Sequence, residues 1–586
     1  MGAAPAFAHD APPSAARASP DALDAGLSRL HHPVSTHNHQ AQEYFDQGMR
    51  LVFAFNHEAA IKSFQRALEI DPELAMAHWG IALALGPNIN LPMGSAAHQA
   101  AYAELQKAIA LKTKASPIER EYIDALSARY SANANADLAP LQLAYKNAMK
   151  ELVRRHPQDT DAAVLYAESL MDLHPWKLWG PDGTPTEGTL ELVHVLEHAQ
   201  AQQPNHIGAL HYYIHAIEAS PHPEKALAAA KRLENLAPSA GHLVHMPAHI
   251  YIRTGNYIDA IRVNEAAVRA DERLAASGAK SYYLAAYYGH NLHFLAICNA
   301  IAGNYARAIA AADKLYAHAS PMIREIPSLD GFLYTPAMVL AKFGRWDEIL
   351  ALPEPPFEAP ISGTVWYFAR TLAFAAKGRL VDAAAERAKF LEAANTLPRT
   401  LELGNNDAGQ LVAIARPYLD GRIAMMRGNL AEAIEHFREA IAAEDLLAYD
   451  EPPAWYLSSR EALGAALLRS GDFVGAEKTF RDDLVHNPRT APRSLACTRH
   501  SWQRDVATKR QRFRRVSSEP GARRTSGPTP WHCELGQKQF ERRRSWQFAM
   551  LHCLTTEEQI AIVVTRSNFR LRARPKLLCA DQRRSS

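Results

Sequence analysis

Histidine is concentrated in one part of the chain, with spacings that suit the binding of a metal ion or an anion. Nine of the 27 histidines lie between His206 and His293. Within the segment Gly241 to Gly255, GHLVHMPAHIYIRTG, three histidines are spaced i, i+3 and i+7. These positions share one face of a helix, so the segment predicts a helix with one imidazole-lined side.

The histidine spacing also repeats in register. When segments are numbered from Ile207, Gly241 and Gly289, histidine recurs at the second, fifth and ninth positions. Side chains at i and i+4 of a helix have Cβ atoms about 5 to 6 Å apart, and packed helices lie about 8 to 10 Å apart. A metal ion bonded to nitrogen at about 2.0 to 2.1 Å is therefore within reach of two neighbouring helices. The predicted metal ligands are His211, His215, His242, His245, His249, His290 and His293.

Acidic and aromatic side chains are expected beside these histidines as ligand-binding residues. Glu168 and Asp172 lie one turn apart in a helix expected to begin at Thr160, and Glu218 follows in the Ile207 segment. Trp176 and Trp179 lie in the loop HPWKLWGPDGTP, where we expect either a lid over the site or side chains buried against the helices.

Three interpretations of the histidine pattern remain open at this stage. Histidine with carboxylate suits Zn, Fe or Mn, and histidine alone also suits Cu, so one of these transition metals is the expected cofactor if any is bound. The alternatives are pure packing and a surface that responds to protons near pH 6.5. The sequence contains no HExxH motif, phosphate-binding glycine loop or nucleophile elbow, so hydrolases of those classes are not supported.

Helices are expected to position all of these residues. Alanine and leucine dominate and β-branched runs are few, which favours helix. Helical hairpins recur with a period of about 34 residues, and small residues such as Ala260, Ala308, Ala433 and Ala476 occupy the positions where two helices cross. Because each hairpin exposes an apolar face that only its neighbour can cover, the prediction is an all-α, right-handed superhelical solenoid.

The composition divides the chain into three parts. Residues 1–30 predict a disordered leader, residues 31–488 the solenoid, and residues 489–586 a basic tail. The tail is interpreted as disordered or frame-shifted in preference to a nucleic-acid-binding arm, so nucleic acid is not an expected partner. Cysteine spacing indicates no disulfide framework, and no apolar run is long enough for a membrane span. The start AAPAFAHD predicts a periplasmic or secreted protein if a signal peptide lies upstream of Met1, and a cytoplasmic protein otherwise.

Several segments resemble a family of bacterial tetratricopeptide-repeat (TPR) proteins. They are HHPVST, the AFNH motif within YFDQGMRLVFAFNHEAAIKSF, AMAHWGIALALGPN, HMPAHIYIRTGNYIDAI and YYGHNLHFLAICNAIAGNY. The resemblance extends from about Leu30 to Ser494. It implies that the second, fifth, ninth and twelfth positions of each first helix line a concave groove, so the histidines would form one patch there. It implies no particular biochemical activity.

The function expected from the sequence is a binding scaffold whose histidine-lined groove holds a metal, a small ligand, a peptide or a protein. A competing hypothesis is a metal-dependent enzyme in which Glu168 or Glu218 acts as the base, although the sequence favours a non-enzyme. A third hypothesis is a protein-interaction scaffold without metal.

Overall fold

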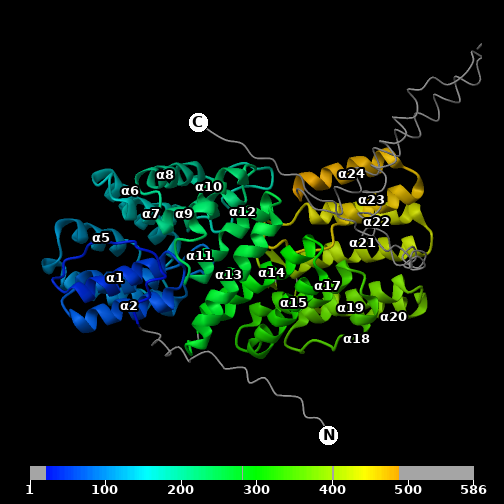
Figure 1. Cartoon of the computed structure of the whole chain (residues 1–586), viewed down its shortest axis with the longest axis horizontal. Helices are drawn as coiled ribbons and strands as arrows, with labels where there is room; N and C mark the ends of the chain where they lie inside the picture. Colours follow the sequence, from blue (N-terminus) through cyan, green and yellow to red (C-terminus); the bar gives the residue numbers. More distant parts are fainter. Residues whose placement is uncertain (1–21, 280, 399–400, 488–586) are drawn as a thin grey trace, which may run out of the picture. The chain divides into compact units, whose positions relative to one another are not determined.

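The chain is built almost entirely from helices. The computed structural model describes residues 22–279, 281–398 and 401–487 (Figure 1). The strands within these ranges are β1 (Glu402–Leu403) and β2 (Asn406–Asp407), which pair antiparallel with Leu403 opposite Asn406. The predicted all-α solenoid of helical hairpins is confirmed, while its right-handed sense and its likeness to TPR hairpins stay predictions.

Short turns join most of the α-helices. Those of the described ranges are α1 (His39–Val52), α2 (His57–Ile70), α3 (Ala75–Ala84), α4 (Ser95–Ala110), α5 (Pro117–Ser127), α6 (Leu138–Arg155), α7 (Thr160–Met171), α8 (Thr189–Gln202), α9 (Ile207–Glu218), α10 (Leu227–Leu233), α11 (Gly241–His245), α12 (Pro247–Arg253), α13 (Tyr257–Ala276), α14 (Gly289–Ile301), α15 (Tyr305–Ala319), α16 (Asp330–Leu333), α17 (Thr335–Lys342), α18 (Trp346–Ala351), α19 (Pro360–Ala376), α20 (Leu380–Thr396), α21 (Ala408–Met426), α22 (Leu430–Glu444), α23 (Ser459–Ser470) and α24 (Phe473–His486).

Five further short helical segments connect these elements. Four are 3₁₀ turns and η3 is a single π-helical turn: η1 (Lys112–Lys114), η2 (Pro223–Ala226), η3 (Leu284–Tyr288), η4 (Ser320–Met322) and η5 (Pro327–Leu329).

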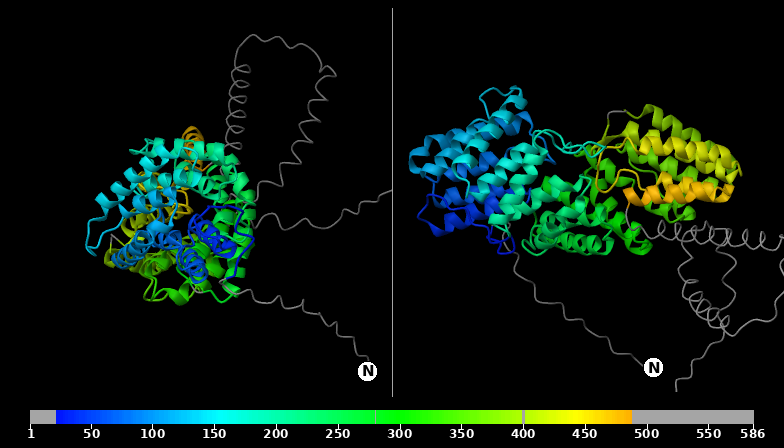
Figure 2. Two further views of the ribbon diagram at one scale, coloured as in Figure 1. Left: turned by 90° about the vertical axis from the view of Figure 1, so that its left-hand side faces the viewer. Right: turned by 90° about the horizontal axis from the view of Figure 1, so that it is seen from above.

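Neighbouring helices contact one another in sequence order, as in a solenoid. Contacts run from α1 to α2, α3 and α4, and again from α6 to α7, α8 and α9, and from α21 to α24. Alternate helices also touch, as α7 touches α9 and α19 touches α21. The further views in Figure 2 show the same order of packed hairpins.

Small side chains allow the two helices of a hairpin to approach closely. Ala260, Ala308, Ala433 and Ala476 are all fully buried, as their positions in the repeat predict. A Cβ atom on Gly48 of α1 would lie 2.4 Å from the Phe64 ring of α2. Any larger residue at position 48 would therefore push the first hairpin apart.

The segment from Gly241 to Gly255 is broken where a single helix was predicted. Helix α11 ends at His245 and α12 begins at Pro247, because Pro247 has no N–H with which to continue the α-helical hydrogen bonding. The His249 N–H instead bonds to the Met246 carbonyl, 3.2 Å away. The break places His245 and His249 on separate short helices.

Part of the predicted leader packs on the first hairpin. Leu27 is buried, and the Asp24 N–H donates to the Gln47 side chain at 2.8 Å. Residues 1–21 and the predicted tail, 489–586, lie outside the described residues, so the predictions made for them remain predictions. Among the described residues, no helix combines the length and apolarity needed to cross a bilayer.

Candidate metal centre

Six of the seven predicted histidine ligands meet in the protein core. His211 and His215 come from α9, His242 and His245 from α11, His249 from α12 and His290 from α14. They form two groups, which we call group A (His211, His215 and His242) and group B (His245, His249 and His290). Within each group, one ring nitrogen per residue lies within 4.8 Å of the others. Repeat register therefore predicted the composition of the cluster, with one exception described below.

In group A, hydrogen bonds to oxygen fix two of the three rings. His211 Nδ1 donates to the Phe53 carbonyl at 2.7 Å, and His215 Nδ1 donates to Glu218 Oε1 at 2.7 Å. A neutral imidazole that donates from Nδ1 carries its lone pair on Nε2. His211 Nε2 lies 3.1 Å from His242 Nε2, and His215 Nε2 has no hydrogen-bond partner. The Nε2 atoms of His211 and His215 are therefore the available ligand atoms of these two rings, whereas the His242 ring makes no hydrogen bond to oxygen within the described ranges and its Nδ1 has no partner there.

Group B repeats this arrangement. His245 Nδ1 donates to Asn264 Oδ1 at 2.7 Å, and the Asn264 amide is held in that orientation because its nitrogen donates to the Ala260 carbonyl. His249 Nδ1 donates to Glu218 Oε2 at 2.5 Å. The two remaining nitrogens, His245 Nε2 and His249 Nε2, face each other at 2.8 Å. Because the pKa of His249 is raised to about 10, this ring carries a hydrogen on each nitrogen and its Nε2–H donates to the His245 Nε2 lone pair. A metal ion bound between the two nitrogens would take the place of this proton.

Glu218 links the two groups. One carboxylate oxygen accepts from His215 of group A and the other from His249 of group B. The residue is only 1% exposed, so water does not compete for these bonds. Burial alone would raise the pKa of Glu218, but His249 and His215 outweigh it and lower the pKa to about 2. The carboxylate is therefore a fixed negative charge between the groups.

Burial also sets the charge of the histidines. It lowers the pKa of four rings well below the usual value, and neighbouring histidines add to this effect at each of them; the four are His211, His242, His245 and His290. Burial would lower the pKa of His249 as well, but the carboxylates of Glu218 and, to a smaller extent, Glu451 outweigh it and raise the pKa to about 10. Most of the cluster thus consists of neutral imidazoles, the form that binds metals.

Two aromatic rings with unusual backbone geometry cover group A. Phe55, in the turn between α1 and α2, stacks on His215 and His242 with ring centroids 5.8 and 5.5 Å away. Trp176, in the predicted lid loop, meets the His215 ring edge-on at 5.6 Å. Phe55 and Trp176 have φ of 56° and 59°, and the only other non-glycine residue with positive φ in the described ranges is Ser28. Such strain costs roughly 1 to 2 kcal/mol per residue and concentrates at functional sites.

The other loop tryptophan holds the covering segment on α9. Trp179 Nε1 donates to the Ala216 carbonyl at 2.7 Å. With Phe55 and Trp176 over the rings, His211, His215, His242, His245 and His249 are each at most 2% exposed. The expected open groove is therefore not found at these residues, because the inserted loop and the α1–α2 turn enclose them.

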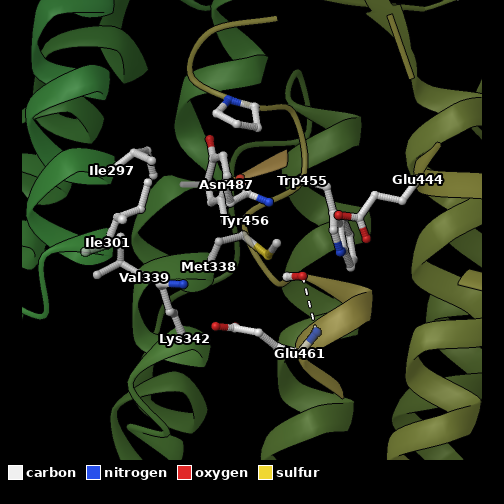
Figure 3. Close-up of a pocket in the computed structure, with 13 residues that line it drawn as sticks. Ile297, Ile301, Met338, Val339, Lys342, Glu444, Trp455, Tyr456, Glu461 and Asn487 are labelled. Atoms are coloured by element: carbon white, nitrogen blue, oxygen red, sulfur yellow. Dashed lines mark hydrogen bonds between the residues drawn. The ribbon is translucent and has the colours of Figure 1, made fainter. Parts of the chain in front are cut away.

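His293 is the exception to the predicted cluster. It lies on α14, one turn from His290, but its Nε2 hydrogen bonds to the Tyr456 hydroxyl, and it belongs to neither group. Tyr456 and Trp455 line a cavity of about 80 Å³ together with Ile297 and Ile301 of α14 (Figure 3). The fifth residue of this repeat therefore bonds to Tyr456 and does not join the other histidines.

Glu168 and Asp172 are brought together with Arg129 and away from both histidine groups. Arg129 NH2 donates to Asp172 Oδ2, while Glu168 Oε2 is buried without a hydrogen-bond partner. Burial and the adjacent Asp172 carboxylate raise the pKa of Glu168 to about 8. Glu168 and Asp172 were expected beside the histidines because they occupy similar repeat positions. They lie elsewhere, because Asp172 pairs with Arg129 in the core.

The sequence interpretation missed several residues that contact the cluster, among them Phe55, Asn264 and Glu451. Phe55 and Asn264 come from turns and second helices, where the repeat pattern predicts packing alone. Glu451 comes from the segment between α22 and α23, which has no repeat pattern, and its Oε2 lies 3.2 Å from His249 Nδ1. The AFNH motif, which contains Phe55, was the one available signal.

Comparison with known proteins yields structural similarity only. The sequence matches no protein-family model, and no curated protein matches it. The solved structures with detectable similarity include the yeast Tom70 crystal structure, with 12% identity over 83% of this chain and 91% of that chain and a TM-score of 0.29. The P58(IPK) TPR domain has 12% identity over 80% of this chain and 99% of that chain, with a TM-score of 0.21. A human IFIT1 dimer with m7Gppp-AAAA has 13% identity over 80% and 91% of the two chains, with a TM-score of 0.29. The solenoid of helical hairpins is shown by the order and contacts of the helices themselves.

Proposed function

We propose that this chain is a metal-binding repeat scaffold in which groups A and B each hold one transition-metal ion. All six ligands are imidazoles, so Zn or Cu is the preferred metal class, with Fe also compatible. Glu218, Asn264 and the Phe53 carbonyl act on the histidines, orienting them as ligands.

One observation carries the proposal: four of the six rings, those of His211, His215, His245 and His249, donate from Nδ1 to an oxygen atom, which leaves Nε2 as the nitrogen that faces the other histidines. Metal-binding histidines characteristically donate their second N–H to a carboxylate or carbonyl oxygen, which fixes the tautomer. Packing alone does not require four such donors to be aligned around shared lone pairs. Leaving buried polar groups unpaired costs about 1 to 3 kcal/mol each, and a bound cation removes that cost.

The nitrogen separations are compatible with shared ligation. Two nitrogens bonded to one tetrahedral metal at about 2.0 to 2.1 Å lie about 3.3 to 3.4 Å apart. The closest pairs are at 3.1 Å in group A and 2.8 Å in group B. The remaining ring of each group is within 4.8 Å, so a movement of about 1.4 Å brings it to bonding distance.

Metal analysis of protein purified without a histidine tag tests the proposal. After reconstitution with Zn or Cu we expect about two bound equivalents per chain, and less than about 0.1 equivalent of every metal would overturn the proposal. The expected loss is one equivalent for His211→Ala, in group A, and one for His245→Ala, in group B. His293→Ala is the matched control, because His293 is buried on the same helix as His290, bonds to Tyr456 and belongs to neither group.

The same measurements address the other expectations. A metal-free interaction scaffold predicts no bound metal in any variant. For the enzyme hypothesis, the positions of the two candidate bases differ: Glu218 accepts two histidine hydrogen bonds, and Glu168 contacts neither group. We assign Glu218 to positioning, and a protein, peptide or small ligand in the concave groove stays a prediction.

A further inference from the structure

Beside the histidine groups, a third set of side chains combines two carboxylates with one imidazole. Glu218, His249 and Glu451 each offer one ligand atom, and these atoms lie within 4.8 Å of one another. All three residues are buried, with at most 6% of the surface of any of them exposed. Glu451 is brought there by the segment between α22 and α23, some two hundred residues after α12 in the chain.

The Glu451 carboxylate lacks a satisfactory partner. Neither of its oxygens accepts a hydrogen bond, although His249 Nδ1 is 3.2 Å from Oε2. That nitrogen carries one hydrogen, which is directed at Glu218 at 2.5 Å. A buried carboxylate without donors is costly unless it is paired with a cation.

His249, whose pKa is raised to about 10, is the one cation paired with these carboxylates in the described ranges, and its single positive charge is shared between Glu218 and Glu451. Arg253 lies nearby, and its guanidinium donates to the main-chain carbonyls of Glu218 and Ser220. It also lies over the Tyr449 ring, 5.4 Å from its centroid. Arg253 thus tethers α12 to the end of α9 and makes no ion pair with Glu451.

We propose that Glu218, His249 and Glu451 form a separate binding site for a divalent cation, chemically distinct from groups A and B. This inference extends the proposed function, since His249 belongs to both sites: its Nε2 faces group B and its Nδ1 faces the two carboxylates. Binding at Nδ1 releases the hydrogen now shared with Glu218 as a proton. Carboxylate oxygens shift the preference toward harder cations such as Mn²⁺, whereas all-imidazole groups prefer Zn or Cu.

The arrangement also explains the position of Glu218. In the metal-free state each of its oxygens accepts one histidine N–H. When a cation occupies the carboxylate site, Oε2 becomes a ligand and Oε1 continues to orient His215. The state of this site is thereby transmitted to group A through one side chain.

Titration of the full chain with Mn²⁺, followed by the electron paramagnetic resonance signal of free Mn²⁺, tests the inference. We expect the wild-type chain to bind Mn²⁺, and Glu451→Gln to weaken this binding by at least about tenfold. Asp450→Asn is the matched control, because Asp450 is the adjacent buried carboxylate and interacts with Asn405 and Asn406 instead of His249.

The outcomes separate this inference from the proposed function. Binding of Zn or Cu without any binding of Mn²⁺, or equal Mn²⁺ affinity in wild type and Glu451→Gln, would overturn the carboxylate site and leave groups A and B intact. A chain that binds none of the three metals would overturn both. If Glu451→Gln does not fold, as judged by circular dichroism, Glu451→Asp retains the charge but withdraws the oxygen atoms, and the same weakening is expected.

Discussion

Replacing Glu218 with glutamine tests the orienting role of the carboxylate while preserving its volume. The wild-type side chain accepts one hydrogen bond from His215 and one from His249, at 2.7 and 2.5 Å. Glutamine has one acceptor oxygen, and its nitrogen is a donor. One of the two histidines must therefore face a donor, and it can do so only by moving its own hydrogen from Nδ1 to Nε2.

The structure sets the size of the effect. A hydrogen on Nε2 blocks that ring as a ligand, and loss of an outer-shell partner typically lowers metal affinity by about 10- to 100-fold. We expect this loss in the group whose histidine changes tautomer. Without metal, the variant also lacks the carboxylate that raises the pKa of His249 to about 10. Breaking a buried charge pair costs about 3 to 5 kcal/mol, so the free energy of unfolding of the metal-free chain is expected to fall by that amount.

Three measurements on Glu218→Gln check these expectations. Competition with a chelator gives the metal affinities, nitrogen-15 magnetic resonance of the histidine rings gives the tautomers, and denaturant unfolding gives the stability. Glu234→Gln is the matched control, because this buried carboxylate pairs with Arg262 and Lys231 and contacts no histidine of the cluster. It is expected to change stability alone. Wild-type affinities at both groups, with Nδ1 still protonated in both rings, would refute the reasoning.

Three further predictions concern the surroundings of the cluster. Trp176→Ala should speed metal removal by a chelator about tenfold or more. Lowering the free energy of local opening by only about 1.4 kcal/mol makes the open state about tenfold more populated. An unchanged removal rate would contradict the covering role of this ring. Phe55→Ala should lower the free energy of unfolding by about 3 to 5 kcal/mol, the usual cost of removing a buried phenylalanine, and should weaken metal binding in group A. The control is Phe55→Leu, which restores most of the volume but no aromatic ring. Wild-type stability and metal affinity in Phe55→Ala would contradict the prediction. Because burial and Asp172 raise the pKa of Glu168 from 4.5 to about 8, the folded chain retains a proton that the unfolded chain releases, so this residue's contribution to stability is complete below pH 4.5 and is lost as the pH rises through about 8. Between pH 6 and pH 9 the free energy of unfolding should fall less in Glu168→Gln than in wild type. Equal falls in the two proteins would show that Glu168 is not the source of the pH dependence.

Local sequence determined the helices and the register of the histidines. Small residues at the crossing positions and apolar residues at helical spacing reflect a period of 3.6 residues, and this period is a property of each helix alone. The equivalent repeat positions of the histidines in α9, α11 and α12 predicted that these side chains lie close together. The structure agrees, because successive hairpins stack with the same face inward. For the same reason Ala260, Ala308, Ala433 and Ala476 are buried as expected.

Only the tertiary structure decided which side chains meet across long distances in the chain. The Phe53 carbonyl accepts from His211, 158 residues away, and Glu451 reaches His249 from a segment without a repeat pattern. Register misplaced His293, which shares a helix with His290 but bonds to Tyr456. It misplaced Glu168 as well, because Arg129 draws the neighbouring carboxylate into a separate core contact. A helical period fixes the face on which a residue lies, whereas the partner of that face depends on how loops and distant hairpins pack against it.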